Sequence, residues 1–193
     1  MIMKKYIGIA LVGAFAAFGV ACGDDEQPGT GGTGGGGGDE CVITAEEIAE
    51  DTTWDRTDCD YVLTRITYVV GAKLTIAAGV TVKGDAGSAL VITSTGEIDA
   101  QGTSTDPIVM TSSRAEGARL TGDWGGLAML GKAILSWGGA DCDGIGDCTA
   151  TLEGLPGGET RAEYGGDDDT HNCGTCLLYT SDAADDWYKV VIS

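Results

Sequence analysis

The chain has 193 residues, of which 33 are glycine and only 2 phenylalanine, so its apolar content is mostly aliphatic and a long helical bundle is not expected. Its formal net charge of −19 argues against nucleic acid and anionic lipid headgroups as partners, because an acidic surface repels both. His171 is the only histidine, which excludes a mechanism that needs two imidazoles.

The N-terminus reads as an export signal. Lys4 and Lys5 precede an apolar run over residues 7–20, which is short for a bilayer span and typical of a signal peptide. The next residues, GVAC, resemble the lipobox of bacterial lipoproteins, in which the cysteine receives fatty acyl chains such as palmitate and becomes the new N-terminus. We therefore predict a lipoprotein signal peptide over residues 1–21 and lipidation of Cys22. An ordinary secretory signal with an incidental cysteine is the alternative.

Residues 22–40 read as a flexible, acidic, glycine-rich linker. The sequence GDDEQPGTGGTGGGGGDE offers no large apolar side chain to bury, so we expect it to remain disordered. A flexible coil of about 5–6 Å × √n would place the folded part roughly 25 Å from the anchor. Gly23 stands where the enterobacterial sorting rule has Asp in proteins kept at the inner membrane. We therefore expect a protein anchored by lipid in the outer membrane, on its periplasmic or its outer side.

Residues 41–175 contain a short sequence pattern that is repeated three times. LTIAAGVTVKG begins at Leu74, LVITSTGEIDAQG at Leu90 and IVMTSS at Ile108, which gives steps of 16 and 18 residues. Apolar residues alternate within each run as in a strand, and Gly, Asp, Ser and Thr stand between the runs where the backbone turns. Repeats this short cannot bury an apolar face alone, so they favour an all-β fold in which stacked units form a parallel β-helix.

That architecture predicts which side chains face inward together. Leu74, Leu90 and Ile108 would form one ladder, and Val80 with Ile98 another, because strands of adjacent coils lie about 4.7–4.9 Å apart. A β-sandwich with irregular hairpins is the alternative architecture.

Four segments carry a resemblance to a known group: ITYVVGAKLTIAAGVTVKG, GEIDAQGTSTDPIVMTS, GDWGGLAMLGKA and EYGGDD. Between about residues 48 and 175 the chain resembles bacterial surface lipoproteins that are predicted to form right-handed parallel β-helices. The resemblance implies a right-handed coil and an envelope location, and it implies no particular activity.

The cysteine spacing fits an oxidising compartment, where disulfides persist. Cys41 with Cys59, and Cys142 with Cys148, are spaced as two disulfides, while sequence alone leaves the connectivity open. Closing a loop of roughly 15–20 residues would contribute about 3 kcal/mol to stability.

The segment from Cys176 to Ser193 is predicted to be foreign to the protein. CLLYTSDAAD looks like the in-frame translation of a transposon-end sequencing adapter, with the codons TGT CTC TTA TAC ACA TCT GAC GCT GCC GAC. The native protein would then continue past Thr175, leaving the β-helix of residues 41–175 incomplete. The C-x-x-C of Cys173 and Cys176 would be accidental rather than a redox or zinc motif.

Two acidic loops are the candidate metal sites. DCDGIGD groups Asp141, Asp143 and Asp147, and GGDDDTHN offers Asp167 and Asp169. Carboxylate oxygens at such spacing suit Ca²⁺, the one cofactor these loops could hold. The first loop fails the EF-hand pattern, and solvated loops of an acidic extracellular protein are the simpler interpretation, so no metal site is assigned.

No catalytic residues are assigned, because no cluster defines a reaction. Polysaccharide-cleaving β-helix proteins need a calcium-bound acidic cluster with a basic residue, or paired carboxylates. Arg65, Lys73 and Lys83 have no evident carboxylate partner one coil away. Trp124, in GDWGG, could stack on a sugar, but we prefer to interpret the segment as a corner of the coil with a packed aromatic side chain.

We therefore expect a non-catalytic structural, adhesive or binding protein at the cell surface. Its partners would be the membrane, through the lipid, and an extracellular polysaccharide or protein. A carbohydrate-binding or polysaccharide-cleaving β-helix protein is the alternative.

Overall fold

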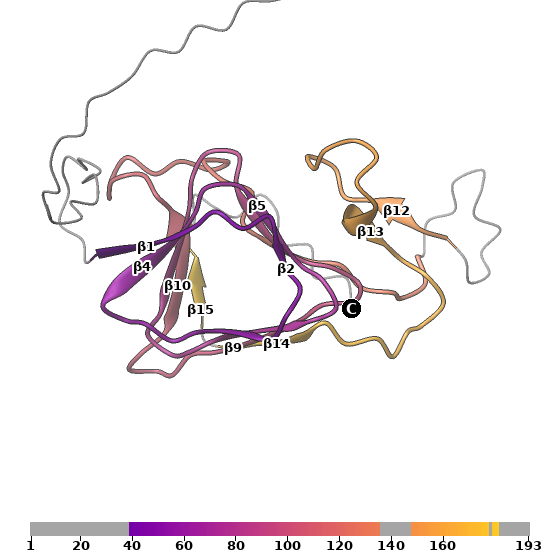
Figure 1. Cartoon of the computed structure of the whole chain (residues 1–193), viewed down its shortest axis with the longest axis horizontal. Helices are drawn as coiled ribbons and strands as arrows, with labels where there is room; N and C mark the ends of the chain where they lie inside the picture. The colour runs from indigo at the N-terminus through magenta and orange to yellow at the C-terminus, as the bar shows by residue number, and fades with distance from the viewer. Residues whose placement is uncertain (1–38, 136–147, 178, 182–193) are drawn as a thin grey trace, which may run out of the picture. The chain divides into compact units, whose positions relative to one another are not determined.

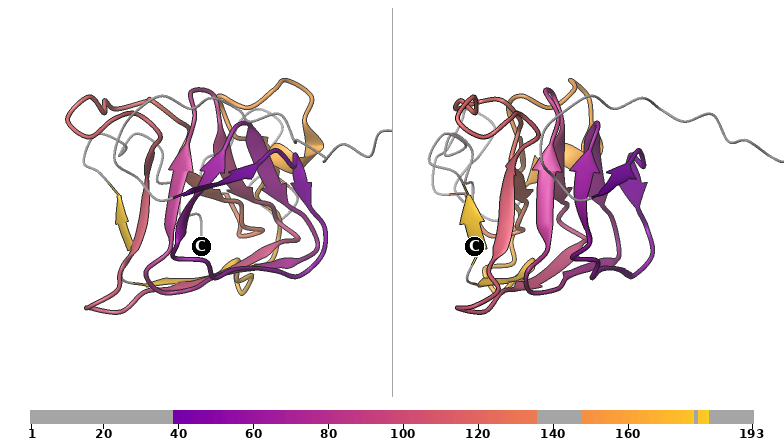
Figure 2. Two further views of the ribbon diagram at one scale, coloured as in Figure 1. Left: turned by 60° about the vertical axis from the view of Figure 1, so that its left-hand side comes forward. Right: turned by 90° about the vertical axis from the view of Figure 1, so that its left-hand side faces the viewer.

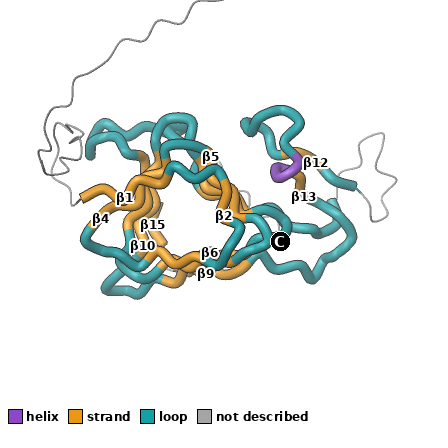
Figure 3. Tube along the Cα trace, in the orientation of Figure 1, coloured by secondary structure: helices purple, strands orange, loops and turns teal. Residues whose placement is uncertain are grey.

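The computed structural model describes residues 39–135, 148–177 and 179–181, and these form three parallel sheets around a common interior (Figures 1 and 3). Sheet A contains β1 (Asp39–Ile43), β4 (Cys59–Leu63), β7 (Thr81–Gly84), β10 (Ile108–Ser112) and β15 (Tyr179–Ser181). Sheet B contains β2 (Glu47–Ile48), β5 (Ile66–Val69), β8 (Ala89–Ile92) and β11 (Leu127–Met129). Sheet C contains β3 (Thr52–Trp54), β6 (Lys73–Ile76), β9 (Glu97–Gln101) and β14 (Gly174–Leu177).

The chain visits sheets A, B and C in turn, so that three strands make one coil. Strands of consecutive coils lie side by side (Figure 2), and every strand pair within these three sheets is parallel. Cys41 pairs with Tyr61 twenty residues later, and Leu74 pairs with Ile98 twenty-four residues later. The predicted parallel β-helix is confirmed, and the sandwich alternative is excluded because its hairpins would pair antiparallel.

The predicted inward ladders are wrong. Leu74, Leu90 and Ile108 lie in β6, β8 and β10, which belong to three different sheets. Val80 precedes β7 of sheet A, whereas Ile98 lies in β9 of sheet C. All five side chains are nevertheless fully buried. The three faces share one inward alternation, so steps of 16 and 18 residues lead to a different face of the next coil instead of to the same face.

Aliphatic side chains from all three sheets fill the interior. Its fully buried members include Leu63, Val69, Leu74, Val82, Leu90, Ile92, Ile98 and Ile108. In the first coils Trp54 stacks on Tyr61 with ring centroids 5.0 Å apart. Each buried aliphatic side chain of this size contributes about 1.5–3 kcal/mol, so the filled interior is the main source of stability.

Sheet B is apolar on its outer face as well. Tyr68 and Val91, which are register partners in β5 and β8, point away from the interior yet are buried in a second cluster with Ala128. Leu152 and Leu155 pack against this cluster from the segment between β11 and β14. We call that segment the insertion; its described parts are residues 130–135 and 148–173.

The insertion carries the only antiparallel pair in the described part of the chain. β12 (Ala150–Thr151) pairs with β13 (Glu163–Tyr164), and the short 3-10 helix η1 (Thr160–Ala162) precedes β13. Within the described ranges, no helix has the length and apolar character needed to cross a membrane.

The predicted disulfide between Cys41 and Cys59 is present, with the Cα atoms 5.7 Å apart. It joins β1 to β4 and so ties the first coil to the second. Cys148 is disulfide-bonded too, and Cys142, its predicted partner, lies outside the described residues.

Replacing both Cys41 and Cys59 by Ser should lower the free energy of unfolding by about 3 kcal/mol, because the cross-link restricts the unfolded chain. Urea unfolding of the double variant beside the wild-type chain measures the change. An unchanged unfolding midpoint would show that this cross-link does not stabilise the first coil.

Candidate functional site

A groove runs between the outer face of sheet B and the insertion. It consists of two adjoining hollows, of about 200 and 380 Å³, which share Ile66 and Gly87. Further residues of the first hollow are Ser88, Ala89, Val91, Trp124, Ala128, Leu152, Glu153 and Leu155. Further residues of the second are Glu46, Thr64, Arg65, Tyr68, Pro156 and Glu159. We call the two hollows together the sheet B groove.

Trp124 is a wall of the first hollow because a glycine makes room for it. Its indole lies against Gly84 at the end of β7, where an added Cβ would collide with the ring and come within 2.8 Å of Ser88 Oγ. Asp123, next to it, forms an ion pair with Arg114 at 2.9 Å and accepts a hydrogen bond from the backbone N–H of Leu120 at 2.7 Å. Trp124 is only 5% exposed, so the interpretation of GDWGG as a corner with a packed aromatic is correct.

Three buried polar atoms mark the groove. Tyr68 Oη, Ser88 Oγ and Trp124 Nε1 have no hydrogen-bond partner, and no other buried side-chain oxygen or nitrogen among the described residues shares this condition. All three residues line the groove. An unpaired buried polar atom costs about 1–3 kcal/mol, so three of them beside one groove make this groove the candidate site.

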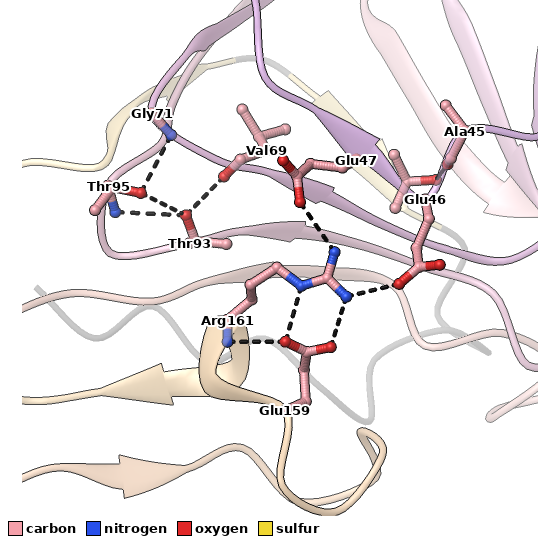
Figure 4. Close-up of polar contacts among 10 residues, drawn as sticks. Ala45, Glu46, Glu47, Val69, Gly71, Thr93, Thr95, Glu159 and Arg161 are labelled. Carbon is pink, nitrogen blue, oxygen red and sulfur yellow. Dashed lines mark hydrogen bonds and ion pairs between the residues drawn. The ribbon is translucent and has the colours of Figure 1, made fainter.

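Arg161 of η1 fastens the insertion to the first coil (Figure 4). Its guanidinium donates to Glu46 at 2.6 Å, to Glu47 at 3.1 Å and to both carboxylate oxygens of Glu159 at 2.6 and 2.8 Å. The same group lies over the Tyr68 ring, 4.1 Å from its centroid. Ion pairs and a cation–π contact therefore hold the insertion over the tyrosine that lines the second hollow.

The same contacts shift the pKa values of this ion-pair cluster. Hydrogen bonds from the Arg161 side chain and backbone N–H lower the pKa of Glu159 from 4.5 to about 2. The carboxylates of Glu159 and Glu46 in turn raise the pKa of Arg161. Burial, and next the charge of Glu159, raises the pKa of Tyr68, so its hydroxyl stays protonated at neutral pH and can donate a hydrogen bond.

The expectation that the lysines of the coils lack carboxylate partners is wrong. Lys73 lies 3.1 Å from Glu97, its register partner in the next coil, and Lys83 lies 2.6 Å from Asp60 in the preceding coil. The assumed repeat was too short to place these pairs together. Arg65 lines the second hollow.

The structure describes one of the two acidic loops that were predicted as calcium sites. Asp141, Asp143 and Asp147 lie outside the described residues. In the second loop Asp167 is exposed, while Asp169 accepts a hydrogen bond from the backbone N–H of Ile134 at 3.0 Å and so fixes the insertion. Over the described ranges, no group of three or more His, Cys, Asp or Glu side chains is placed to hold a metal ion.

Cys173 and His171 form a pair that sequence reasoning missed. Cys173 Sγ lies 3.6 Å from His171 Nδ1 and donates to the carbonyl of Leu130 at 3.4 Å, while His171 Nε2 lies 3.1 Å from the carbonyl oxygen of Ser94. Burial raises the pKa of the Cys173 thiol, so it remains protonated at neutral pH. The pair packs the insertion against the coils and lacks the activated thiolate that a nucleophile needs.

The Glu159–Arg161 ion pair should stabilise the fold in a defined pH range. Because folding lowers the pKa of Glu159 from 4.5 to about 2, its contribution is complete above pH 4.5 and is lost as the pH falls towards 2. The Tm of the wild-type chain should therefore exceed that of Glu159→Gln at pH 5–8, and the difference should shrink below pH 4.5.

Glu153→Gln, also in the insertion, is the matched control and should follow the wild type at every pH. A Tm difference between wild type and Glu159→Gln that does not change between pH 4.5 and 2 would contradict this assignment.

Comparison with known proteins agrees with the coiled architecture. Residues 46–180 match a family described as the pectate-lyase like beta helix domain, and the match covers well over half of the chain. Comparisons with curated proteins and with solved structures found no match. The matched region runs from the residue before β2 into β15, so it includes sheet B and the described insertion that together form the groove. The chain belongs to the family of pectate-lyase-like β-helix domains.

Proposed function

We propose that this chain is the binding domain of a lipid-anchored envelope protein and that its sheet B groove holds an extracellular polysaccharide without cleaving it. The three unpartnered atoms of Tyr68, Ser88 and Trp124 carry the proposal. Sugar hydroxyls both donate and accept hydrogen bonds, so a saccharide can supply partners to all three. The family description supports the same ligand class, since it refers to polysaccharide-degrading enzymes.

The form of the groove also supports a binding role. Ligand sites are mostly apolar hollows with a few placed polar groups, and this groove combines the apolar outer face of sheet B with three such groups. Its two adjoining hollows lie over neighbouring strands, β5 and β8, which suits an extended chain better than a single compact ligand.

Two of the three carboxylates that border the groove are engaged in ion pairs, which favours binding over cleavage. A glycosidic general acid needs a raised pKa and a free proton, whereas the Arg161 contacts lower the pKa of Glu159 to about 2. Glu46 is held by the same guanidinium at 2.6 Å. Both carboxylates are thus occupied in holding the insertion.

Tyr68→Phe should weaken polysaccharide binding about tenfold, because it deletes one hydrogen bond to the ligand. Affinity electrophoresis of the full chain through gels containing a panel of soluble polysaccharides measures this loss. Tyr61→Phe, in the interior away from the groove, is the matched control and should bind as the wild type does.

Reducing ends should not increase in the same polysaccharides after incubation with the chain. Their release would replace the binding role by cleavage, and a wild-type chain that no polysaccharide retards would contradict the proposal.

The lipid anchor is tested separately. Cys22→Ala should abolish incorporation of labelled palmitate into the protein expressed in a bacterium, because the thiol that receives the lipid is gone. Equal labelling of the variant and the wild type would rule out Cys22 as the anchor.

A further inference from the structure

The two hollows of the sheet B groove differ in chemistry. Charged side chains border the second hollow, at Glu46, Arg65 and Glu159. The first hollow has mostly apolar walls, made by Ile66, Ala89, Val91, Ala128, Leu152 and Leu155. Within those walls the unpartnered polar groups are the hydroxyl of Ser88 and the indole N–H of Trp124.

The polar groups of the first hollow call for a hydrogen-bond acceptor. An indole N–H only donates, and the serine hydroxyl can donate as well. A sugar hydroxyl placed here could accept from the indole and donate to the serine oxygen, but it would leave the apolar walls of the hollow without a contact. An ester or amide carbonyl accepts two hydrogen bonds and carries no hydrogen of its own. A methyl group attached to it could pack on Ala89, Val91 and Ala128.

The volume of the hollow is sufficient for such a group. An apolar protein cavity of about 150 Å³ admits a benzene molecule, and this hollow measures about 200 Å³. An acetyl group together with the edge of the sugar ring that bears it is therefore within its capacity.

The charge around the groove selects against acidic polysaccharides. Three carboxylates and one arginine border it, namely Glu46, Glu153, Glu159 and Arg65, and the positive charge of Arg161 is already shared among three carboxylates. With a formal net charge of −19 on the whole chain, a polyuronate such as pectate would be repelled. An uncharged polysaccharide avoids this repulsion.

We infer that the first hollow binds the acetyl group of an uncharged, acetylated polysaccharide, an inference that rests on the proposed binding role of the groove. Ser88 and Trp124 donate to the acetyl carbonyl, and the apolar wall receives the methyl group. Both polar atoms are covered in the free protein, so the side chains beside them must shift when the acetyl group binds.

The test compares uncharged polysaccharides before and after removal of their acetyl groups. Acetylated glucomannan and acetylated xylan are each immobilised in native form and after mild alkaline deacetylation, with polygalacturonate as the acidic comparison. The full chain should bind an acetylated form at least about tenfold more tightly than its deacetylated counterpart, the loss expected for about one and a half kilocalories of contacts.

Ser88→Ala and Trp124→Phe each remove one donor, so each should reduce this preference by several-fold. Trp54→Phe and Ser104→Ala, which lie outside the groove, should keep the wild-type preference. Ser88→Ala should not lower the Tm of the free protein, because the deleted hydroxyl has no partner to lose. Trp124→Phe also shrinks a packed indole, so its Tm is compared with that of Trp54→Phe, which makes the same change at another buried tryptophan. This second readout separates a loss of recognition from a loss of folding.

The outcomes distinguish a failure of the acetyl inference from a failure of the proposed binding function. Equal binding of acetylated and deacetylated forms, still weakened by Tyr68→Phe, would overturn the acetyl assignment and leave the binding role intact. Tightest binding to polygalacturonate would overturn the preference for an uncharged ligand. Binding to none of these polymers would overturn both the inference and the proposed function.

Discussion

The register between stacked coils is the constraint on which the rest of the structure depends. Parallel hydrogen bonding sets each strand residue beside its equivalent in the next coil, as Leu74 beside Ile98 and Tyr68 beside Val91. Inward positions must then be apolar in every coil, because each one covers the next. The corners must also pass closely over one another: a Cβ on Gly96 would collide with the backbone of Val69 in the preceding coil. Sheet B adds a second demand, since its outer face is apolar too and needs the insertion to cover it.

The insertion that covers the outer face of sheet B also forms the candidate site. It covers Tyr68 and Val91 but leaves hollows of about 200 and 380 Å³ beside them, and it is fastened by Arg161 to carboxylates of the first coil. The groove therefore combines a floor of paired strands with a wall that apolar packing and ion pairs hold in place. Three unpartnered polar atoms in such a place reduce stability, which is the kind of local inconsistency expected where a protein binds a ligand.

The sequence predicted the fold class but neither the coil length nor the groove. The alternation of apolar residues within short runs, with turn residues between the runs, was enough to predict stacked parallel strands. The disulfide of Cys41 with Cys59 was predicted from the spacing of the cysteines. The repeat length was wrong because three faces with one alternation look alike, and this error also hid the Lys73–Glu97 pair. The groove could not be predicted, because Tyr68, Trp124 and Glu159 come together only through the insertion. Cys22 and the first acidic loop lie outside the described residues, so their assignments stay predictions.

The coil register can be measured directly by cross-linking. Thr75 and Asp99 are register partners on the outer side of sheet C, so a chain with both replaced by Cys should form a disulfide on oxidation, detected by peptide mapping with mass spectrometry. A 16-residue repeat would instead place Thr75 beside Val91, on a strand that the structure assigns to sheet B. The account predicts a cross-link in the Thr75→Cys, Asp99→Cys chain and none in the Thr75→Cys, Val91→Cys chain; the reverse result would contradict it.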